Sequence, residues 1–150
     1  MKQILNLGIL WVFYSVASFS YADCYFDIEV GDYLRFSAVD MTVEKSCESI
    51  SLNLVHSGKL PANVMGHNWV LTKTADVQAV AGEGMRAGLA ADYVPSGDAR
   101  VIAATAIIGG GENTGVTLAT ADLIVGEEYT YFCSFPGHSY TMRGKLIVNP

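Results

Sequence analysis

The chain has 150 residues, of which 51% are hydrophobic and 16% are charged. This length suits a single domain, and the apolar content is sufficient for a packed core, which excludes a largely disordered chain. Fifteen acidic residues against nine basic ones give a net charge of −6, so we expect neither nucleic acid nor an anionic membrane surface as a partner.

The N-terminal segment has the features of a secretory signal peptide. Lys2 precedes an apolar stretch at residues 4–14, and small residues occupy the −3 and −1 positions of a cleavage point after Ala22. The stretch is shorter than the roughly 20 residues of a membrane span, although an uncleaved anchor is the alternative. We therefore expect residues 1–22 to be removed and residues 23–150 to form one exported domain with a net charge of −7.

From Cys24 onwards, short segments of alternating apolar and polar residues dominate the chain. Clusters of Gly, Asn and Asp separate these segments. The alternation predicts β-strands at residues 24–30, 34–38, 41–45, 50–54, 68–73, 100–107, 114–120, 128–134 and 142–148. Many short strands on one core are typical of an all-β fold, and we expect an antiparallel Greek-key sandwich or barrel of about eight strands.

One segment departs from the strand pattern. Apolar residues between Asp76 and Leu89 recur at helical spacing, and Asp76 is a suitable N-cap. Glycines at positions 82, 84 and 88 weaken the helical pattern, because glycine is a poor helix former. We expect one short helix near residues 76–89, outside the sandwich.

The chain has three cysteines, and export would allow two of them to pair. A bridge between Cys24 and Cys47 would close a loop that stabilises the fold by roughly 3 kcal/mol. Cys133 would then be the unpaired thiol. An unpaired cysteine in an exported protein is more often a buried or dimer-forming thiol than a metal ligand. The odd number of cysteines alone therefore does not decide the role of Cys133.

The segment around Cys133 brings together three ligand types. Cys133, His138 and Met142 follow one another in a C-x4-H-x3-M pattern, with a tight turn at residues 135–137 between two predicted strands. A thiol, an imidazole and a thioether favour copper over magnesium or calcium, although zinc also binds Cys and His and is the alternative metal. A second imidazole is available from His67, which precedes another predicted strand.

These motifs resemble those of the azurins, small periplasmic blue copper proteins with the cupredoxin fold. The resemblance runs from about Cys24 to Val148 and is strongest in the segments NVMGHNWVL (63–71) and CSFPGH (133–138). It implies a copper ion with His67, Cys133 and His138 as equatorial ligands, Met142 as a weak axial ligand and the Gly66 carbonyl opposite. It also implies a disulfide between Cys24 and Cys47.

The resemblance further implies roles for the residues around this site. Asn68 would connect the His67 loop to the Cys133 strand, and the Phe135 N–H would donate to the sulfur. The ring edge of His138 would lie in an exposed apolar patch where redox partners dock. The patch residues carried over are Leu34, Leu60, Val64, Met65, Met85, Phe135, Pro136 and Gly137.

Four further residues need interpretation. The resemblance places His56 near the metal as a partly buried titrating group, although we favour the reading of a core histidine whose hydrogen bonds are satisfied. Trp69 is expected in the core. Tyr140 and Thr141 depart from the small or aliphatic residues usual before the methionine, and would make the patch more polar or change its shape.

The expected function is one-electron transfer through a single type 1 copper. The resemblance implies a monomeric carrier between redox proteins of the periplasm, of the c-type cytochrome or copper reductase class. Because the ligand set leaves no open coordination position, we expect a carrier and not an enzyme. A copper-delivery module without redox traffic is the alternative, and half of a copper reductase is disfavoured because the chain has no histidines for a second metal site.

Overall fold

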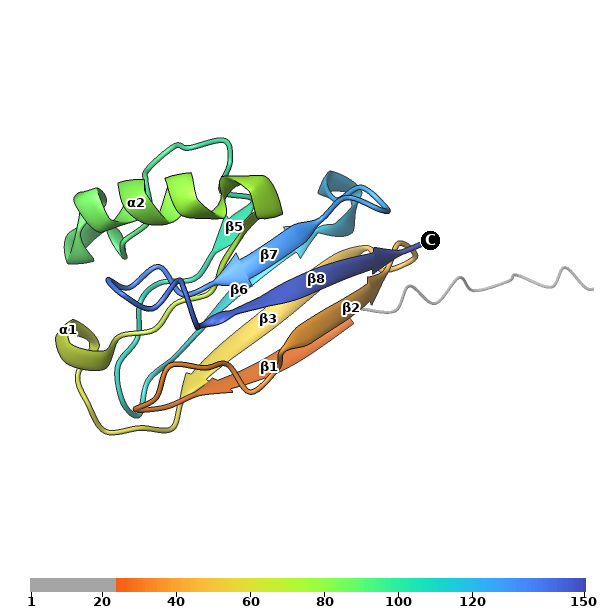
Figure 1. The fold of residues 1–150 in the computed structure, drawn as a ribbon. Coiled ribbons are helices and arrows are strands. Elements are labelled where there is room, and N and C mark those ends of the chain that lie inside the picture. The colour runs from red at the N-terminus through yellow and green to blue at the C-terminus, as the bar shows by residue number, and fades with distance from the viewer. Residues whose placement is uncertain (1–23) are drawn as a thin grey trace, which may run out of the picture.

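A computed structural model describes residues 24–150 as a sandwich of two β-sheets (Figure 1). The predicted signal peptide lies outside the described residues. The three-stranded sheet has the order β1–β3–β6, and the five-stranded sheet has the order β2–β8–β7–β4–β5. The strands are β1 (Cys24–Val30), β2 (Asp40–Glu44), β3 (Ser49–His56), β4 (Val70–Lys73), β5 (Ala103–Ala104), β6 (Asn113–Ala119), β7 (Tyr129–Phe132) and β8 (Arg143–Asn149). The expectation of an eight-stranded sandwich is confirmed.

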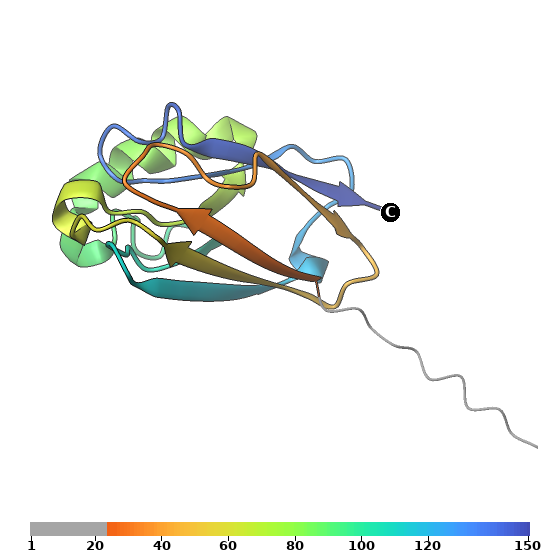
Figure 2. The same ribbon diagram turned by 90° about the horizontal axis from the view of Figure 1, so that it is seen from below.

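The strand pairings are mixed, so the expectation of a purely antiparallel fold is wrong. β1 pairs parallel to β3, and β2 pairs parallel to β8. Parallel neighbours need a crossover connection, and here β2 in the other sheet forms part of the crossover between β1 and β3. Figure 2 shows the three-stranded sheet with β3 between its two neighbours.

Two of the predicted strands differ from the observed ones. Residues 34–38 form a loop that folds back along β1, where the Ser37 N–H donates to the Glu29 carbonyl at 2.9 Å. The segment 100–107 contributes only the two-residue β5. Beyond β5 the chain leaves the sheet, and Ile108 bridges to His67 instead.

The external helix is α2 (Val77–Ala87), which confirms the helix expected near residues 76–89. It lies between the 3₁₀ turns η1 (Thr74–Asp76) and η2 (Leu89–Ala91). Asp76 occupies the N-cap position, but its side chain makes no capping hydrogen bond. A further one-turn helix, α1 (Ala62–Met65), was not predicted from the sequence, and the 3₁₀ turn η3 (Thr120–Asp122) follows β6.

The core has two parts, one between the sheets and one under α2. Trp69 is fully buried between the sheets and stacks on Tyr131 with ring centroids 5.6 Å apart, as expected for a core aromatic. Val80 of α2 packs with Val70 and Phe132 on the opposite face of the five-stranded sheet. All four residues of β7 are therefore buried, because both faces of this strand are covered.

Cys24 and Cys47 form the disulfide, which links the start of β1 to the turn between β2 and β3. Among the described residues, no helix is both long and apolar enough to cross a membrane.

Candidate metal centre

The candidate ligands gather at the end of the sandwich that carries α1, opposite the C-terminus (Figure 1). β4 and β7 are antiparallel neighbours with Val70 opposite Phe132. His67 precedes β4 and Cys133 follows β7, so the pairing brings both residues to the same end of the sheet. The sheet register thus joins two motifs that lie 66 residues apart in the sequence.

Backbone hydrogen bonds hold the loop between β7 and β8 in a closed form. The His138 N–H donates to the Phe135 carbonyl at 3.0 Å, and the Met142 N–H donates to the His138 carbonyl at 2.9 Å. The Cys133 N–H donates to the Met142 carbonyl at 3.0 Å. Gly137 adopts a φ of +84°, a conformation that side-chain-bearing residues rarely adopt. The loop therefore turns His138 back towards Cys133.

Three side chains meet in this closed loop. The Cys133 Sγ lies 3.7 Å from His67 Nδ1 and 3.5 Å from His138 Nδ1. All three side chains are buried, and their ligand atoms lie within 4.8 Å of one another. Metal–sulfur bonds of about 2.3 Å and metal–nitrogen bonds of about 2.0 Å place sulfur and nitrogen about 3.6–3.8 Å apart around one ion. The separations in this chain therefore fit a single metal ion.

A hydrogen bond on the far side of the His67 ring selects the tautomer that can bind a metal. His67 Nε2 lies 2.8 Å from the Gly31 carbonyl oxygen. A carbonyl can only accept, so Nε2 carries the proton and the lone pair of Nδ1 faces Cys133. Orientation of this kind by an outer partner is usual for metal-binding histidines.

Asn68 connects three segments around the centre. Its Nδ2 donates to Ser134 Oγ at 2.8 Å and to the Asp92 carbonyl at 2.7 Å, while its Oδ1 accepts the Ser134 N–H at 2.9 Å. The sequence led us to expect the link between the His67 loop and the Cys133 strand. The sequence did not predict the hydrogen bond from Asn68 to Asp92, which lies in the segment after α2.

Burial shifts the pKa values of the candidate ligands. Burial raises the pKa of the Cys133 thiol to about 12, while the backbone N–H groups of Asn68 and Phe135 act in the opposite direction. Burial lowers the pKa of His67 to about 4 and that of His138 below its usual value. Without metal at neutral pH, the centre therefore holds a protonated thiol and two uncharged imidazoles. A cation would replace the thiol proton.

Met142 and Gly66 lie beside the three-residue cluster. Met142 is fully buried, and its main chain is bonded to both Cys133 and His138. The Gly66 carbonyl oxygen lies 3.9 Å from the Cys133 Sγ. A Cβ on residue 66 would lie 2.2 Å from the Ala62 carbonyl, so α1 can pack against this position only because it is a glycine.

His56 lies behind the cluster with both ring nitrogens engaged. Its ring centroid is 5.1 Å from that of His67. The Gly58 N–H donates to His56 Nδ1 at 3.0 Å, which leaves Nε2 as the donor to the Met65 carbonyl at 3.0 Å. This is the geometry of a core histidine whose hydrogen bonds are satisfied.

His138, around which the sequence predicts an exposed apolar patch, is itself 5% exposed. Phe135 lies against the His138 ring at 4.5 Å, and the Tyr93 ring contacts Phe135 at 5.4 Å. Tyr93 was not expected here. The expected residues whose side chains are exposed are Leu34, Leu60, Val64 and Met85, while Met65, Phe135 and Pro136 are half-buried and Gly137 is exposed.

Comparison with known proteins places this centre in a family. Residues 22–149 match the model of the copper-binding proteins of the plastocyanin/azurin family. The chain belongs to the plastocyanin/azurin family. It is 49% identical over 145 residues to an azurin of Bordetella pertussis, covering 97% of this chain and 96% of the relative. It is 50% identical over 127 residues to an azurin of Pseudomonas aeruginosa, covering 85% of this chain and 86% of the relative.

A solved structure agrees with this assignment. The azurin Az-iso2 of Methylomonas sp. strain J superimposes with a TM-score of 0.83 at 46% identity, covering 86% of this chain and all of the other. The cluster of His67, Cys133 and His138, with Met142 beside it, is consistent with one type 1 copper. The chain is thus an azurin homologue, an electron carrier and not an enzyme, as expected.

Proposed function

We propose that His67, Cys133 and His138 would hold the copper ion of this carrier, with Met142 and the Gly66 carbonyl as weaker ligands. The observation that supports this proposal is the buried cluster of one thiol and two imidazoles whose lone pairs converge. Copper, when bound, supplies one-electron chemistry between Cu(II) and Cu(I). A mixed set of thiolate, imidazoles and thioether suits both oxidation states.

The surrounding residues hold the ligands still. The Gly31 carbonyl orients His67, and Asn68 fixes the distance between the His67 loop and the Cys133 strand. The Phe135 and Asn68 N–H groups stabilise negative charge on the sulfur, since both lower the pKa of the thiol. Little movement of the chain is then needed when the electron arrives or leaves.

Electrons would enter and leave through His138. We propose that the exposed apolar patch around its ring docks other redox proteins briefly, of the c-type cytochrome or copper reductase class, and that the carrier works as a monomer. Small, weak interfaces of this kind are typical of redox encounters. We propose that the protein acts in the periplasm. Cleavage after Ala22 would leave a mature domain of residues 23–150. N-terminal sequencing of the exported protein tests this cleavage point.

Addition of Cu(II) to the metal-free mature protein tests the ligand assignment. We expect an intense blue thiolate-to-copper absorption band that is absent in Cys133→Ser and unchanged in Cys24→Ala/Cys47→Ala, which removes the other two cysteines. A colourless complex would contradict the assignment. A copper-delivery role would instead show rapid loss of Cu(II) to a chelator, whereas a buried site predicts slow loss.

A further inference from the structure

Four exposed cations of the described chain lie in or directly beside the segments that carry the proposed docking patch and the ligand loop. Arg35 follows Leu34, Lys59 precedes Leu60, and Arg86 follows Met85, so each of these three exposed cations is next in the sequence to an exposed patch residue. Within residues 24–150, none of these three forms an ion pair. Arg143 is the fourth; its guanidinium donates to the carbonyl of Tyr140 in the ligand loop. We call Arg35, Lys59, Arg86 and Arg143 the cationic rim.

Three carboxylates in the loops beside the patch segments, Asp32, Asp92 and Glu112, bind backbone N–H groups. Asp32 accepts the N–H groups of Lys59 and Leu60 at 2.9 and 3.1 Å. Asp92 accepts the Ile107 N–H, and Glu112 accepts the Gly109 N–H. These carboxylates serve to shape the loops, and their charge is partly offset by the donors they bind.

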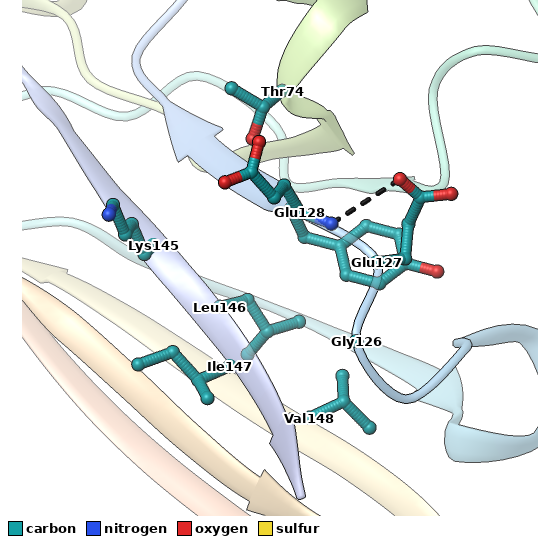
Figure 3. Close-up of a pocket in the computed structure, with 9 residues that line it drawn as sticks. Thr74, Gly126, Glu127, Glu128, Lys145, Leu146, Ile147 and Val148 are labelled. Atoms are coloured by element: carbon teal, nitrogen blue, oxygen red, sulfur yellow. Dashed lines mark hydrogen bonds between the residues drawn. The ribbon is translucent and has the colours of Figure 1, made fainter.

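The rest of the described chain has the opposite balance. It contains four other cations and eleven other carboxylates. Three of these four cations already have partners. Lys73 pairs with Glu127, Arg100 pairs with Glu83 and Asp98, and Lys45 donates to backbone carbonyls. The acidic neighbours Glu127 and Glu128 line a pocket of about 290 Å³ and are drawn in Figure 3. None of its lining residues belongs to the metal centre.

The net charge of the whole protein therefore differs from the charge next to the proposed docking patch. Residues 31–35, 58–65, 85–93, 107–112 and 133–143, the segments that carry the patch, the ligand loop and the loops beside them, contain four cations and three carboxylates, while the remainder of the described chain contains four cations and eleven carboxylates. At physiological ionic strength, charges beyond about 8 Å are largely screened. A partner that touches the patch thus interacts mainly with the cationic rim.

We propose that the patch docks a redox protein whose own electron-exchange site is bordered by acidic side chains, and that the cationic rim aligns this partner while the acidic remainder repels it from other faces. This inference rests on the proposed docking function of the patch. Charge complementarity of this kind mainly raises association rates and selects the orientation of the encounter. The exposed Tyr140, with Arg143 lying 5.8 Å from its ring centre, extends the rim beside the ligand loop.

Two double variants with the same change in net charge test the proposal. Lys59→Gln/Arg86→Gln removes two rim charges, and Lys73→Gln/Lys145→Gln removes two cations elsewhere on the surface. The probe is hexacyanochromate(III), a paramagnetic trianion, added to the copper(I) protein while backbone amide signals are recorded by NMR. We expect broadening at residues 34–35, 59–60, 86 and 137, reduced about threefold or more in the rim variant and little changed in the other.

Electron transfer gives a second measurement with the same variants. Hexacyanoferrate(III) takes one electron from the copper(I) protein and becomes hexacyanoferrate(II). The rim variant is expected to slow this reaction about three- to tenfold at 0.05 M ionic strength, with less effect from the matched variant. Equal effects of the two variants, or broadening centred on Lys73 and Lys145, would overturn the cationic rim. Failure of the proposed function looks different, because it removes the blue band or the electron transfer and leaves the broadening map intact.

Discussion

Asn68 and Ser134 are joined by three hydrogen bonds beside the metal centre, one of them from Ser134 Oγ to Asn68 Oδ1 at 3.2 Å. The Ser134 N–H donates to Asn68 Oδ1 at 2.9 Å, and Asn68 Nδ2 donates to Ser134 Oγ at 2.8 Å. Because residues 68 and 134 each follow a candidate ligand directly, these bonds set the spacing between His67 and Cys133. The same amide also reaches the Asp92 carbonyl.

Asn68→Ala is therefore expected to destabilise the metal-free protein by about 2–3 kcal/mol, because it leaves buried backbone groups of Ser134 and Asp92 without partners. Urea unfolding followed by the emission of Trp69 measures this change. Asn53→Ala is the matched control: this half-buried amide donates to Asp27 on the surface, so its loss is expected to cost less than about 1 kcal/mol. Equal losses for the two variants would contradict the role of Asn68.

Metal binding is expected to release about one proton per ion at pH 7. Cys133, with a thiol pKa of about 12, must lose its proton, whereas His67, with a pKa of about 4, is already uncharged, as is His138. Titration of Zn²⁺ into weakly buffered protein with a pH indicator measures the release. Cys133→Ser is expected to release close to none. Release of two or more protons would show that a histidine is charged in the metal-free centre.

The stability of the metal-free protein is expected to fall as the pH is lowered from about 6.5 to about 4. The pKa of His67 is about 4 in the folded protein and 6.5 when unperturbed, so the unfolded chain binds more protons in this window. Protonation therefore favours unfolding, by no more than about 3 kcal/mol for this residue. Carboxylates also titrate here, so the measurement is the difference in slope between the wild type and His67→Gln. Parallel slopes would contradict the burial of an uncharged His67.

Two glycines of α2 are expected to respond oppositely to alanine. A Cβ at Gly84 would lie 2.0 Å from the Tyr93 carbonyl oxygen, so Gly84→Ala is expected to destabilise the fold by about 1–3 kcal/mol. A Cβ at Gly82 would have nothing within 4 Å, and Gly82→Ala is expected to stabilise the helix by about 0.5–1 kcal/mol. Urea unfolding of the two variants decides this. A stabilised Gly84→Ala would show that α2 can move away from Tyr93.

The candidate ligands could be predicted because their chemistry is local in the sequence. Cys133 and His138 lie five residues apart around a tight turn, and His67 lies in a motif of nine residues that resembles the azurins. The Gly31 carbonyl and the Asn68 N–H could not be found in this way. They are backbone groups, which every residue carries, and only the folded chain shows which of them point at the centre.

The errors in the predicted fold have a similar cause, because they too concern contacts that only the folded chain makes. Residues 34–38 alternate like a strand, but they form a loop whose Ser37 N–H donates to the Glu29 carbonyl of β1. The parallel pairing of β1 with β3 depends on a crossover through the other sheet, which alternation does not encode. The fit of α2 against Tyr93 requires Gly84, a residue that lowers helix propensity and so weakened the sequence pattern.

β7 is covered on both faces, and this determines how the thiol of Cys133 can react. Cys133 directly follows this strand and is itself fully buried. An alkylating or oxidising reagent can reach the sulfur only when the chain around it opens, either locally at the ligand loop or by unfolding. In the metal-free protein, the rate of thiol modification thus measures how often the chain opens around the sulfur, and burial protects the cysteine from irreversible oxidation before metal binds.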